Sequence, residues 1–382
     1  MKKNIVIDLF CGAGGESQGI HDAFTSRGMD IKLYAVNHWQ VACNTHATNF
    51  PSDECICQDI QTVIPTDLVA PNEDVELLWA SPECTNFSVA KGGRPLDDQS
   101  RCTPFDIVRW LTMLRVKRVI IENVPEFLTW GPLTKAGRPD QRYKGQFFMW
   151  FINSLKSLGY IVDWKVCCAA DYGAPTTRSR LFIQAVKKGS GKKLVWPHPT
   201  HSQTGHEDMF GSLQKWIPAR EIIDFSIPST PIEKRKRPLC RNTMKRIENG
   251  IRAFWKDEAV PFLVRYNGGE NRYHSLEEPM PVLDCSNRYG LVEPLLMEYY
   301  GNGTCRPVSE PLGTVTTKER FALLEPNLEN FSIGFRMLTP KELAAAQSFP
   351  SGYRFTGCKT DVVKQIGNAV CPKMAEALVA NA

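Results

Sequence analysis

The sequence lacks the features that define several common classes of protein. No two cysteines have the Cys-x-x-Cys spacing, which argues against a zinc ribbon, a zinc finger or a thioredoxin-like redox motif. No apolar run approaches the roughly 18 residues that a membrane-spanning helix needs. The thirteen cysteines are an odd number, and no secretory signal opens the chain. We therefore expect a cytoplasmic protein with reduced thiols, no bound metal and no membrane association.

A large excess of charge of either sign is also absent. The formal net charge is +5, with 23% charged and 42% apolar residues, as in an ordinary soluble globular protein. A small positive charge is compatible with a polyanionic partner without requiring one. The 382 residues can bury a large core, and we expect them to divide into two domains.

The N-terminal residues predict the opening of a nucleotide-binding fold. Residues 4–10 form a short, β-branched apolar run that is typical of a buried parallel strand. Gly12 and Gly14 follow, and a helical pattern begins near Glu16. Because glycines let a backbone pass beneath a ligand and turn tightly into a helix, this order predicts a doubly wound α/β fold. A plain tight turn is the alternative, and the spacing is not that of a dinucleotide fingerprint.

Further apolar runs continue the alternation of strands and helices. Strands are expected at residues 31–36, 55–57, 75–80 and 118–124. Trp39 follows the first of these and could cover the face of an adenine, although a tryptophan packed in the core is the alternative. Asp59 follows the next strand and is a candidate acceptor for an exocyclic amine. These side chains predict a nucleoside-like ligand at the carboxyl ends of the strands.

A single cysteine follows the fourth strand in a polar, turn-prone segment. Pro82 ends the apolar run, and Cys84 follows two residues later. A thiol at the carboxyl end of a strand lies where chemistry occurs in open α/β sheets, which predicts a nucleophile. A buried structural thiol is the alternative. The glycine-rich loop at Gly92 could close over a bound substrate.

An acid and two arginines follow the cysteine. Glu122 comes directly after three β-branched residues at the end of the fifth strand, where partial removal from water favours a protonated, donating carboxyl. A solvated glutamate at a strand end is the alternative. Arg178 and Arg180 alternate in an extended segment, so we expect both on one face. Two guanidiniums on one face suit a carbonyl, a carboxylate or a phosphate.

The composition changes near residue 187, where Pro, Gly, His and basic residues become frequent. We expect a first domain over 1–186, a smaller, β-rich and irregular domain over 187–330, and a C-terminal segment over 331–382 that returns to the first. A basic run suits phosphate contact, with a solvated face as the alternative, and polar loops suit base edges. These candidate DNA contacts are Lys234, Arg235, Arg237, Arg272, Lys318 and Arg320.

Six motifs in order give the chain a resemblance, over nearly its whole length, to the DNA (cytosine-5) methyltransferase family. They are Asp8-Leu-Phe-Cys-Gly-Ala-Gly-Gly15, Pro82-Glu-Cys84 with Phe87-Ser88, Glu122-Asn-Val124, Arg178-Ser-Arg180, Arg336-Met-Leu-Thr-Pro340, and Gly367-Asn-Ala-Val370 with Pro372. The resemblance implies a Rossmann-like, S-adenosyl-L-methionine-binding catalytic domain and a target-recognition domain between the fourth and fifth motifs. It also implies an enzyme of the bacterial or phage modification type.

The resemblance implies a role for each catalytic candidate. The Cys84 thiolate would add to C6 of a cytosine flipped out of duplex DNA. Glu122 would hold or protonate N3, and Arg180, with Arg178, would steady the carbonyl and the transient charge. C5 would then take a methyl group from S-adenosyl-L-methionine, and S-adenosyl-L-homocysteine would be the product.

The resemblance also implies a cofactor site and further DNA contacts. By family position the cofactor would be lined by Phe10, Gly12, Gly14, Trp39, Asp59, Pro82, Asn368 and Val370. His38 stands in place of the usual acidic partner of the ribose, and Thr176 in place of a glutamine. Glu83 is inserted between the proline and the cysteine of the second motif. Ser88 and Gly92 are expected to contact DNA.

The expected partner is double-stranded DNA, bound by a monomer in the cytoplasm at the nucleoid. A cognate restriction endonuclease is a candidate second partner. Two alternatives remain open at this point: an RNA cytosine-5 methyltransferase, and a catalytically silent DNA-binding relative, which the altered cysteine loop suggests.

Overall fold

The computed structural model describes residues 3–82, 103–135, 137–208, 211–255, 260–266, 268–298, 305–307, 321–322 and 333–380. In these ranges the helices are α1 (Gly15–Thr25), α2 (Gln40–Asn49), α3 (Pro65–Leu68), α4 (Pro104–Met113), α5 (Gln146–Ser157), α6 (Arg241–Phe254), α7 (Pro340–Ala346), α8 (Lys359–Asn368) and α9 (Pro372–Ala380).

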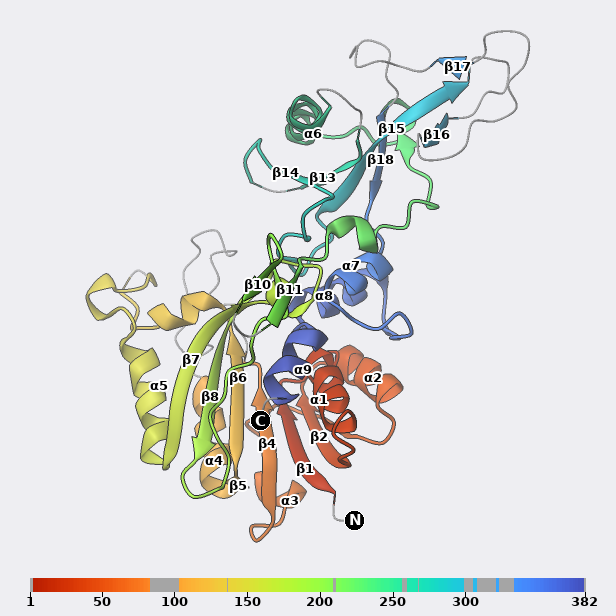
Figure 1. The fold of residues 1–382 in the computed structure, drawn as a ribbon. Coiled ribbons are helices and arrows are strands. Elements are labelled where there is room, and N and C mark those ends of the chain that lie inside the picture. The colour runs from red at the N-terminus through yellow and green to blue at the C-terminus, as the bar shows by residue number, and fades with distance from the viewer. Residues whose placement is uncertain are drawn as a thin grey trace.

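The strands form three sheets (Figure 1). They are a large sheet, a small sheet and an antiparallel sheet that is called the second sheet below. The large sheet contains β1 (Asn4–Leu9), β2 (Ile31–Asn37), β3 (Glu54–Cys57), β4 (Asp74–Ala80), β5 (Arg115–Val116), β6 (Arg118–Asn123), β7 (Tyr160–Cys168) and β8 (Ser179–Lys187). The small sheet contains β9 (His201–Ser202), β10 (His206–Asp208) and β11 (Gly211–Lys215). The second sheet contains β12 (Thr230–Pro231), β13 (Phe262–Arg265), β14 (Tyr273–Ser275), β15 (Tyr289–Glu298), β16 (Cys305–Pro307), β17 (Phe321–Ala322) and β18 (Ile333–Met337).

The large sheet has the strand order β3-β2-β1-β4-β6-β8-β7, with β5 paired to β4. The strands from β1 to β6 run parallel, whereas β8 is antiparallel to β6 and β7 is antiparallel to β8. The order reverses between β1 and β4, which creates a topological switch point at their carboxyl ends. The expected doubly wound, mostly parallel α/β sheet is confirmed, and the four predicted strands correspond to β2, β3, β4 and β6.

Apolar side chains cover both faces of the large sheet, which explains why its central strands are continuous apolar runs. In β1, Ile7 belongs to the core shared with α4 and α5. The next side chain toward the N-terminus, Val6, belongs to the core shared with α1 and α9. Helices therefore shield the sheet on two sides, and only the strand ends are left for ligands.

The C-terminal helix α9 packs beside α1, although the two are far apart in sequence (Figure 1). A Cβ atom on Gly19 would lie 2.4 Å from the carbonyl oxygen of Pro372, so the close approach requires glycine. The buried Arg118 donates from Nη2 to Gln184 Oε1 at 2.7 Å and to the Leu378 carbonyl oxygen at 3.0 Å. These bonds tie the C-terminal helix to the sheet.

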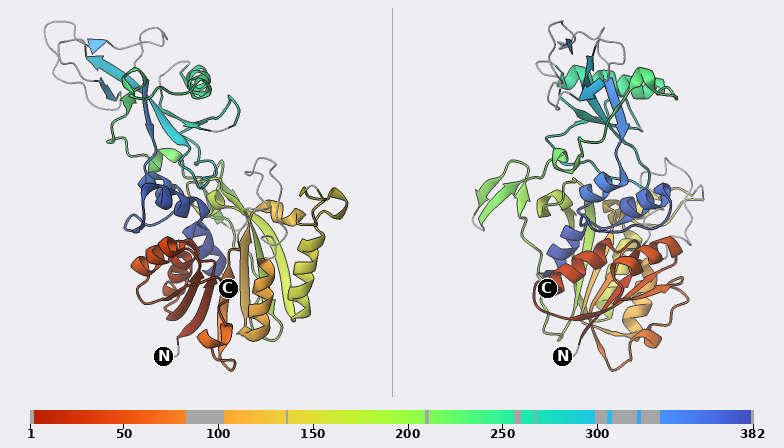
Figure 2. Two further views of the ribbon diagram at one scale, coloured as in Figure 1. Left: turned by 180° about the vertical axis from the view of Figure 1, so that it is seen from behind. Right: turned by 90° about the vertical axis from the view of Figure 1, so that its right-hand side faces the viewer.

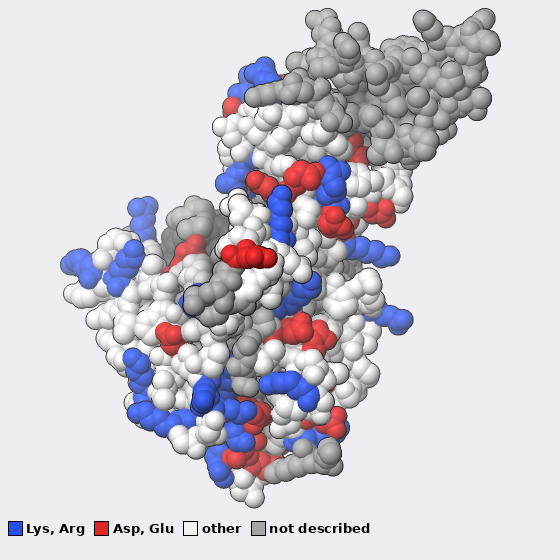
Figure 3. Space-filling model, in the orientation of Figure 1, with Lys and Arg blue, Asp and Glu red and all other residues white. Residues whose placement is uncertain are grey.

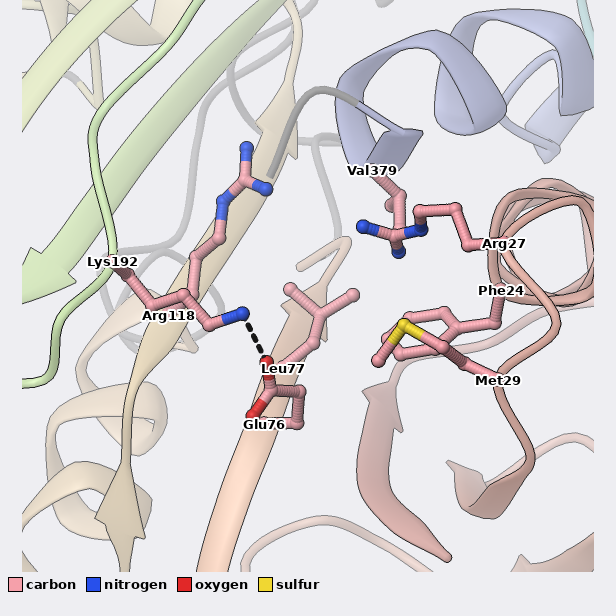
Figure 4. Close-up of a pocket in the computed structure, with 8 residues that line it drawn as sticks. All are labelled: Phe24, Arg27, Met29, Glu76, Leu77, Arg118, Lys192 and Val379. Carbon is pink, nitrogen blue, oxygen red and sulfur yellow. Dashed lines mark ion pairs between the residues drawn. The ribbon is translucent and has the colours of Figure 1, made fainter.

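A small pocket lies beside this anchor, toward the amino ends of β4 and β6. Figure 4 shows Arg118 and Val379 on its wall, together with an ion pair between Lys192 and Glu76. The pocket is therefore at the opposite strand ends from the switch point and belongs to the packing of the C-terminal helix.

The second sheet has the order β12-β18-β15-β13-β14, with β16 and β17 also paired to β15. All of these pairs are antiparallel. The helix α6 covers it through a core that includes Ile247, Phe262 and Phe335. Figures 1 and 2 show this sheet beyond the carboxyl ends of the large sheet, with α7 and α8 between the two. Its strand β18 lies in the predicted C-terminal segment, and the division of the chain at 187 and 331 remains a prediction.

Candidate active site at the carboxyl ends of the strands

The predicted cofactor loop begins at the switch point. The Ser81 amide donates to the Leu9 carbonyl oxygen at 3.1 Å, which extends the pairing of β1 and β4 by one residue. The backbone then turns through positive φ at Phe10 (63°), Gly12 (50°) and Gly14 (85°). A positive φ is unusual at a phenylalanine and occurs where a turn or a site requires it. Gly14 is the N-cap of α1 and supplies no side chain to the first amides of the helix, so those donors are available to a ligand.

A buried polar network supports this loop from below. The Ser17 hydroxyl donates to the Asp8 carboxylate, and Ser17 Oγ lies 3.0 Å from His46 Nε2. Burial raises the pKa of Asp8 to about 8 and lowers the pKa of His46 to about 4. The Tyr353 hydroxyl donates to the Ala13 carbonyl oxygen. The loop is therefore held by neutral forms of Asp8 and His46 near neutral pH.

The predicted cofactor residues that follow β2 and β3 lie at the carboxyl ends of the strands, as the cofactor loop does. His38 and Asp59 are exposed, and Trp39 is half-buried at the start of α2. The Lys364 ammonium, on α8, lies 4.4 Å from the centre of the Trp39 ring. Trp39 is thus a rim residue that contacts a cation, and it is not part of the described hydrophobic cores.

Glu122 and Arg180 form an ion pair across two strands. Arg180 Nε lies 3.0 Å from Glu122 Oε1, and the side chains are only 15% and 10% exposed. Glu122 is in β6, and its register partner in β8 is Phe182. The antiparallel pairing of these strands therefore brings together two motifs that are more than fifty residues apart in sequence.

Arg178 has a different environment from Arg180. It is 3% exposed, and its Nη1 donates to the carbonyl oxygens of Gly367 at 3.0 Å and Leu283 at 3.3 Å. Arg180 thus pairs with a carboxylate, whereas Arg178 donates to backbone carbonyl oxygens. Its contacts are those of a positioning residue that joins the end of α8 to the loop before β15.

The residue after Glu122 holds the segment that leads to the predicted nucleophile. Asn123 Nδ2 donates to the Pro82 carbonyl oxygen at 3.3 Å, and Asn123 Oδ1 accepts from the Val124 amide at 2.9 Å. Pro82 is the last described residue before residue 103. Cys84, Ser88 and Gly92 lie outside the described residues, as do Lys318 and Arg320.

The C-terminal segment that carries the predicted cofactor residues Asn368 and Val370 lies on the other side of the cofactor loop. A Cβ atom on Gly15 would lie 2.3 Å from the Val370 carbonyl oxygen, so the start of α1 touches this segment directly. Asn368 is exposed, and its Oδ1 accepts from Cys285 Sγ at 2.7 Å. The segment therefore lies between the cofactor loop and the loop before β15.

One buried acid at the site was not predicted from the sequence. Glu16 is 2% exposed and lies in the first turn of α1, near the end of β4. Burial and the nearby carboxyls of Asp8 and Glu122 raise its pKa well above the usual value. An acid in a first helical turn usually interacts with the exposed helix end, so its sequence position gives no signal of burial.

The predicted DNA contacts in the described part of the second domain differ in exposure. Lys234 and Arg237 are exposed, whereas Arg235 lies with its guanidinium carbon 5.3 Å from the centre of the Phe335 ring. Arg272 is half-buried beside Gly268. Figure 3 shows basic and acidic side chains intermixed on the face in view, in keeping with the small net charge.

No group of three or more His, Cys, Asp or Glu side chains within the described residues could hold a metal ion. Among the helices in the same part of the chain, none is both long and apolar enough to cross a membrane.

The fold is a mostly parallel α/β sheet with a second, antiparallel sheet beyond the carboxyl ends of its strands. The chain belongs to the family described as C-5 cytosine-specific DNA methylase, whose sequence model matches residues 5–382. Its reaction is DNA cytosine-5 methylation, and the family uses S-adenosyl-L-methionine. The family, the fold class and the reaction predicted from the sequence are thereby confirmed.

Similar proteins extend over nearly the same length. The type II methyltransferase M1.HphI of Haemophilus parahaemolyticus is 28% identical over 97% of this chain and 84% of its own length. The type II methyltransferase M.DdeI of Desulfomicrobium norvegicum is 26% identical over 98% and 87%. Among solved structures, the Dnmt2 methyltransferase of S. pombe covers 99% of this chain and 98% of its own, with a TM-score of 0.59 and 14% identity. A Dnmt2 mutant of Spodoptera frugiperda covers 99% of each chain, with a TM-score of 0.58 and 18% identity. These two likenesses show a shared fold.

Proposed function

We propose that this enzyme flips one cytosine out of a specific duplex sequence and methylates it by covalent catalysis, with Cys84 as the nucleophile. Glu122 and Arg180 serve the flipped base, and the second domain reads the sequence around it. The observation that carries the proposal is the Glu122–Arg180 ion pair, 3.0 Å long and at the carboxyl end of β6. The next residue, Asn123, bonds to the carbonyl of Pro82, two residues before the cysteine.

The proposed chemistry begins with a thiolate. C5 of cytosine is a weak nucleophile, and bonding of the Cys84 sulfur to C6 gives it enamine character. The addition places negative charge on the ring, and a proton from Glu122 to N3 removes that charge. General-acid assistance of this kind contributes about 10²–10⁴-fold. Once C5 carries the methyl group, the N3 proton returns to Glu122, and loss of the C5 proton to solvent breaks the C6–S bond, expels the Cys84 thiolate and restores the ring.

Arg180 holds Glu122 in place and faces the negative charge that the addition creates on the cytosine ring. Its guanidinium is fixed by the ion pair with Glu122 and by a bond from Nη1 to the Ser179 carbonyl oxygen at 2.8 Å. A fixed cation stabilises developing charge more than a mobile one, because it needs no reorganisation during the reaction. We assign the cytosine carbonyl to Arg180 and a positioning role to Arg178.

The cofactor residues fit S-adenosyl-L-methionine, which supplies an electrophilic sulfonium methyl group when bound. The uncapped start of α1 offers amide donors after the positive-φ turn. Trp39, His38 and Asp59 would hold the adenosine part at the ends of β2 and β3. The remaining candidates, which come from the loop after β1 and from two other segments, are Phe10, Gly12, Gly14, Pro82, Asn368 and Val370.

The second domain would supply the duplex contacts. The exposed side chains of Lys234 and Arg237 suit phosphates, and Arg272 suits a base edge. We further propose a modification enzyme of the restriction–modification type that acts as a monomer on cytoplasmic DNA, because M1.HphI and M.DdeI carry type II names. A cognate endonuclease would then be its partner in the cell.

The test uses labelled S-adenosyl-L-methionine with mixed-sequence duplex DNA. We expect label on cytosine C5, loss of label with Cys84→Ala, and an adduct that survives denaturation on 5-fluorocytosine DNA. Cys240→Ser is the matched control, because it also removes one thiol and serine is a good residue at the start of α6. Label confined to RNA, or no label from a cofactor-binding wild type, would refute the proposal. Bisulfite sequencing of DNA from expressing cells would then give the target.

A further inference from the structure

Arg118 is a buried cation whose hydrogen-bonding groups are only partly used. Its side chain is 1% exposed, and its Nη2 donates to Gln184 Oε1 and to the Leu378 carbonyl oxygen. Among the described residues, nothing accepts a hydrogen bond from its Nε or its Nη1. Two of the three guanidinium nitrogens are thus removed from water without an acceptor, which is unfavourable for a charged group.

The small pocket beside Arg118 carries an excess of positive charge. Of the described side chains on its wall, Arg27, Arg118 and Lys192 are cationic and Glu76 is anionic. Figure 4 shows Arg27 and Arg118 on opposite sides of the pocket. Glu76 forms ion pairs with Lys192 and with Lys117, whose Nζ lies 3.2 Å from Glu76 Oε2. The one carboxylate is therefore shared between two ammonium groups and does not balance the guanidiniums.

This excess of charge persists at neutral pH. Burial, and less strongly the charge of Arg27, lower the pKa of Arg118 only to about 10. Arg27 is held beside the pocket, because its Nε donates to the Ala23 carbonyl oxygen at 2.9 Å and its guanidinium carbon lies 4.8 Å from the centre of the Phe24 ring. A water molecule could accept a hydrogen bond from Arg118, but an anion would also offset the positive charge.

We propose that this pocket is a binding site for one monatomic anion such as chloride. Its cavity volume of about 10 Å³ is that of a single small group, so a tetrahedral phosphate or sulfate would not fit inside. A chloride ion accepts hydrogen bonds from any direction, which suits a guanidinium that has nitrogens left over on more than one side. The side chain of Lys192 is 28% exposed, so the pocket reaches solvent along this wall.

An anion in this pocket joins parts of the chain that are far apart in sequence. Arg27 follows α1, Arg118 is the first residue of β6, and Val379 lies in α9. The bound ion therefore holds the C-terminal helix against the sheet and stabilises the folded protein by mass action. The pocket lies at the amino ends of β4 and β6, so anion binding is separate from the reaction proposed at the carboxyl ends.

The test is thermal unfolding of the full chain in sodium chloride and in sodium gluconate at equal ionic strength. Gluconate is too large for the pocket, so the midpoint in chloride should be higher by about 2 °C. Arg118→Met should remove this difference, and Glu76→Gln, which takes away the competing acid, should enlarge it. Arg115→Met is the charge-matched control, because its ion pair with Asp74 is at the surface, and it should keep the wild-type difference.

The NMR line width of chloride gives a second readout that does not depend on unfolding. Wild type and Arg115→Met should broaden the line equally, and bromide should reverse the broadening by competition. Lys192→Met, which leaves Arg118 in place, should broaden it less and serves if Arg118→Met does not fold. Equal midpoints of wild type in the two salts, or broadening that Lys192→Met and Arg118→Met both retain, would overturn the site. Stabilisation by sulfate or phosphate but not by chloride would overturn the assignment of a monatomic anion.

Discussion

The ion pair between Arg180 Nε and Glu122 Oε1, 3.0 Å long, is formed by side chains from the antiparallel strands β8 and β6. Both side chains are mostly buried, so each would lose its partner in a site of low polarity if the other were removed. Pairs in such surroundings act as one unit, and single replacements overlap in their effects.

We therefore expect Glu122→Gln to lower kcat by about 10²–10⁴-fold and Arg180→Met by about 10²–10³-fold. The double variant should be little slower than the slower single variant. Single-turnover methylation measures this, and the Kd of the cofactor should stay near the wild-type value. Effects that multiply would show that the two side chains act independently. Arg142→Met is the control, because its pair with Asp140 is at the surface.

A second prediction separates the two arginines. Arg178→Met removes the donor to the carbonyl oxygens of Gly367 and Leu283, and each buried carbonyl left unpaired costs roughly 1–3 kcal/mol. The midpoint of thermal unfolding should fall clearly while kcat of the folded enzyme stays near the wild-type value, whereas Arg180→Met, which leaves Glu122 without its partner, should be recognised by its loss of kcat. A variant Arg178→Lys that unfolds like wild type but loses kcat as Arg180→Met does would instead make Arg178 a catalytic residue.

A third prediction concerns the basic run before α6. Lys234→Ala and Arg237→Ala remove exposed charges, so each should weaken DNA binding on all sequences and reduce the salt slope by about one. Arg235→Ala should mainly lower stability, because its guanidinium packs on the Phe335 ring. Fluorescence anisotropy between low and moderate salt measures the slopes. Lys188→Ala, beyond the end of β8, should bind like wild type, and unchanged slopes for Lys234 and Arg237 would contradict their assignment.

The large sheet could be predicted from the sequence because its strands are buried on both faces. Within these strands residues 77–80 and 119–121 are continuous and apolar, and the turn formers that follow the strands place the polar candidates at one edge. The helix α9 begins at Pro372, and proline is common at the first position of a helix. In α7 the Thr339 hydroxyl accepts from the Glu342 amide in a capping box, and a threonine followed three residues later by a glutamate is a local pattern that indicates such a cap. These features depend on short-range periodicity and caps.

Long-range pairing explains what the sequence could not reveal. The environment of Arg178 depends on where β8 begins and on carbonyls from residues 283 and 367. Glu16 is buried because Ser81 and the end of β4 lie against the first turn of α1. The strand β18 pairs with β15 in the second sheet, although the next helices return to the first. No local pattern contains this information.

The last prediction concerns the dependence of stability on pH. Burial raises the pKa of Asp8 from 3.8 to about 8, so the folded protein keeps a proton that the unfolded chain loses. The free energy of unfolding therefore falls as the pH rises from about 4 to about 8. Burial lowers the pKa of His46 from 6.5 to about 4, which has the opposite effect between those two values. Above pH 6.5 His46 no longer changes the free energy of unfolding with pH. In that range the effect of Asp8 is therefore not opposed by His46.

Between pH 6.5 and 8 we expect the Asp8 carboxyl to lower the stability of wild type by up to about 2 kcal/mol, since one proton contributes about 1.4 kcal/mol per pH unit. Asp8→Asn keeps an acceptor for the Ser17 hydroxyl but cannot ionise, so its loss should be distinctly smaller and it should be the more stable protein at pH 8. Urea unfolding at the two pH values measures both. Asp67→Asn, an exposed change in α3, should keep the wild-type slope. Parallel slopes for wild type and Asp8→Asn would mean that the Asp8 carboxyl is already ionised in the folded protein, and the loop would then be held by a charged network.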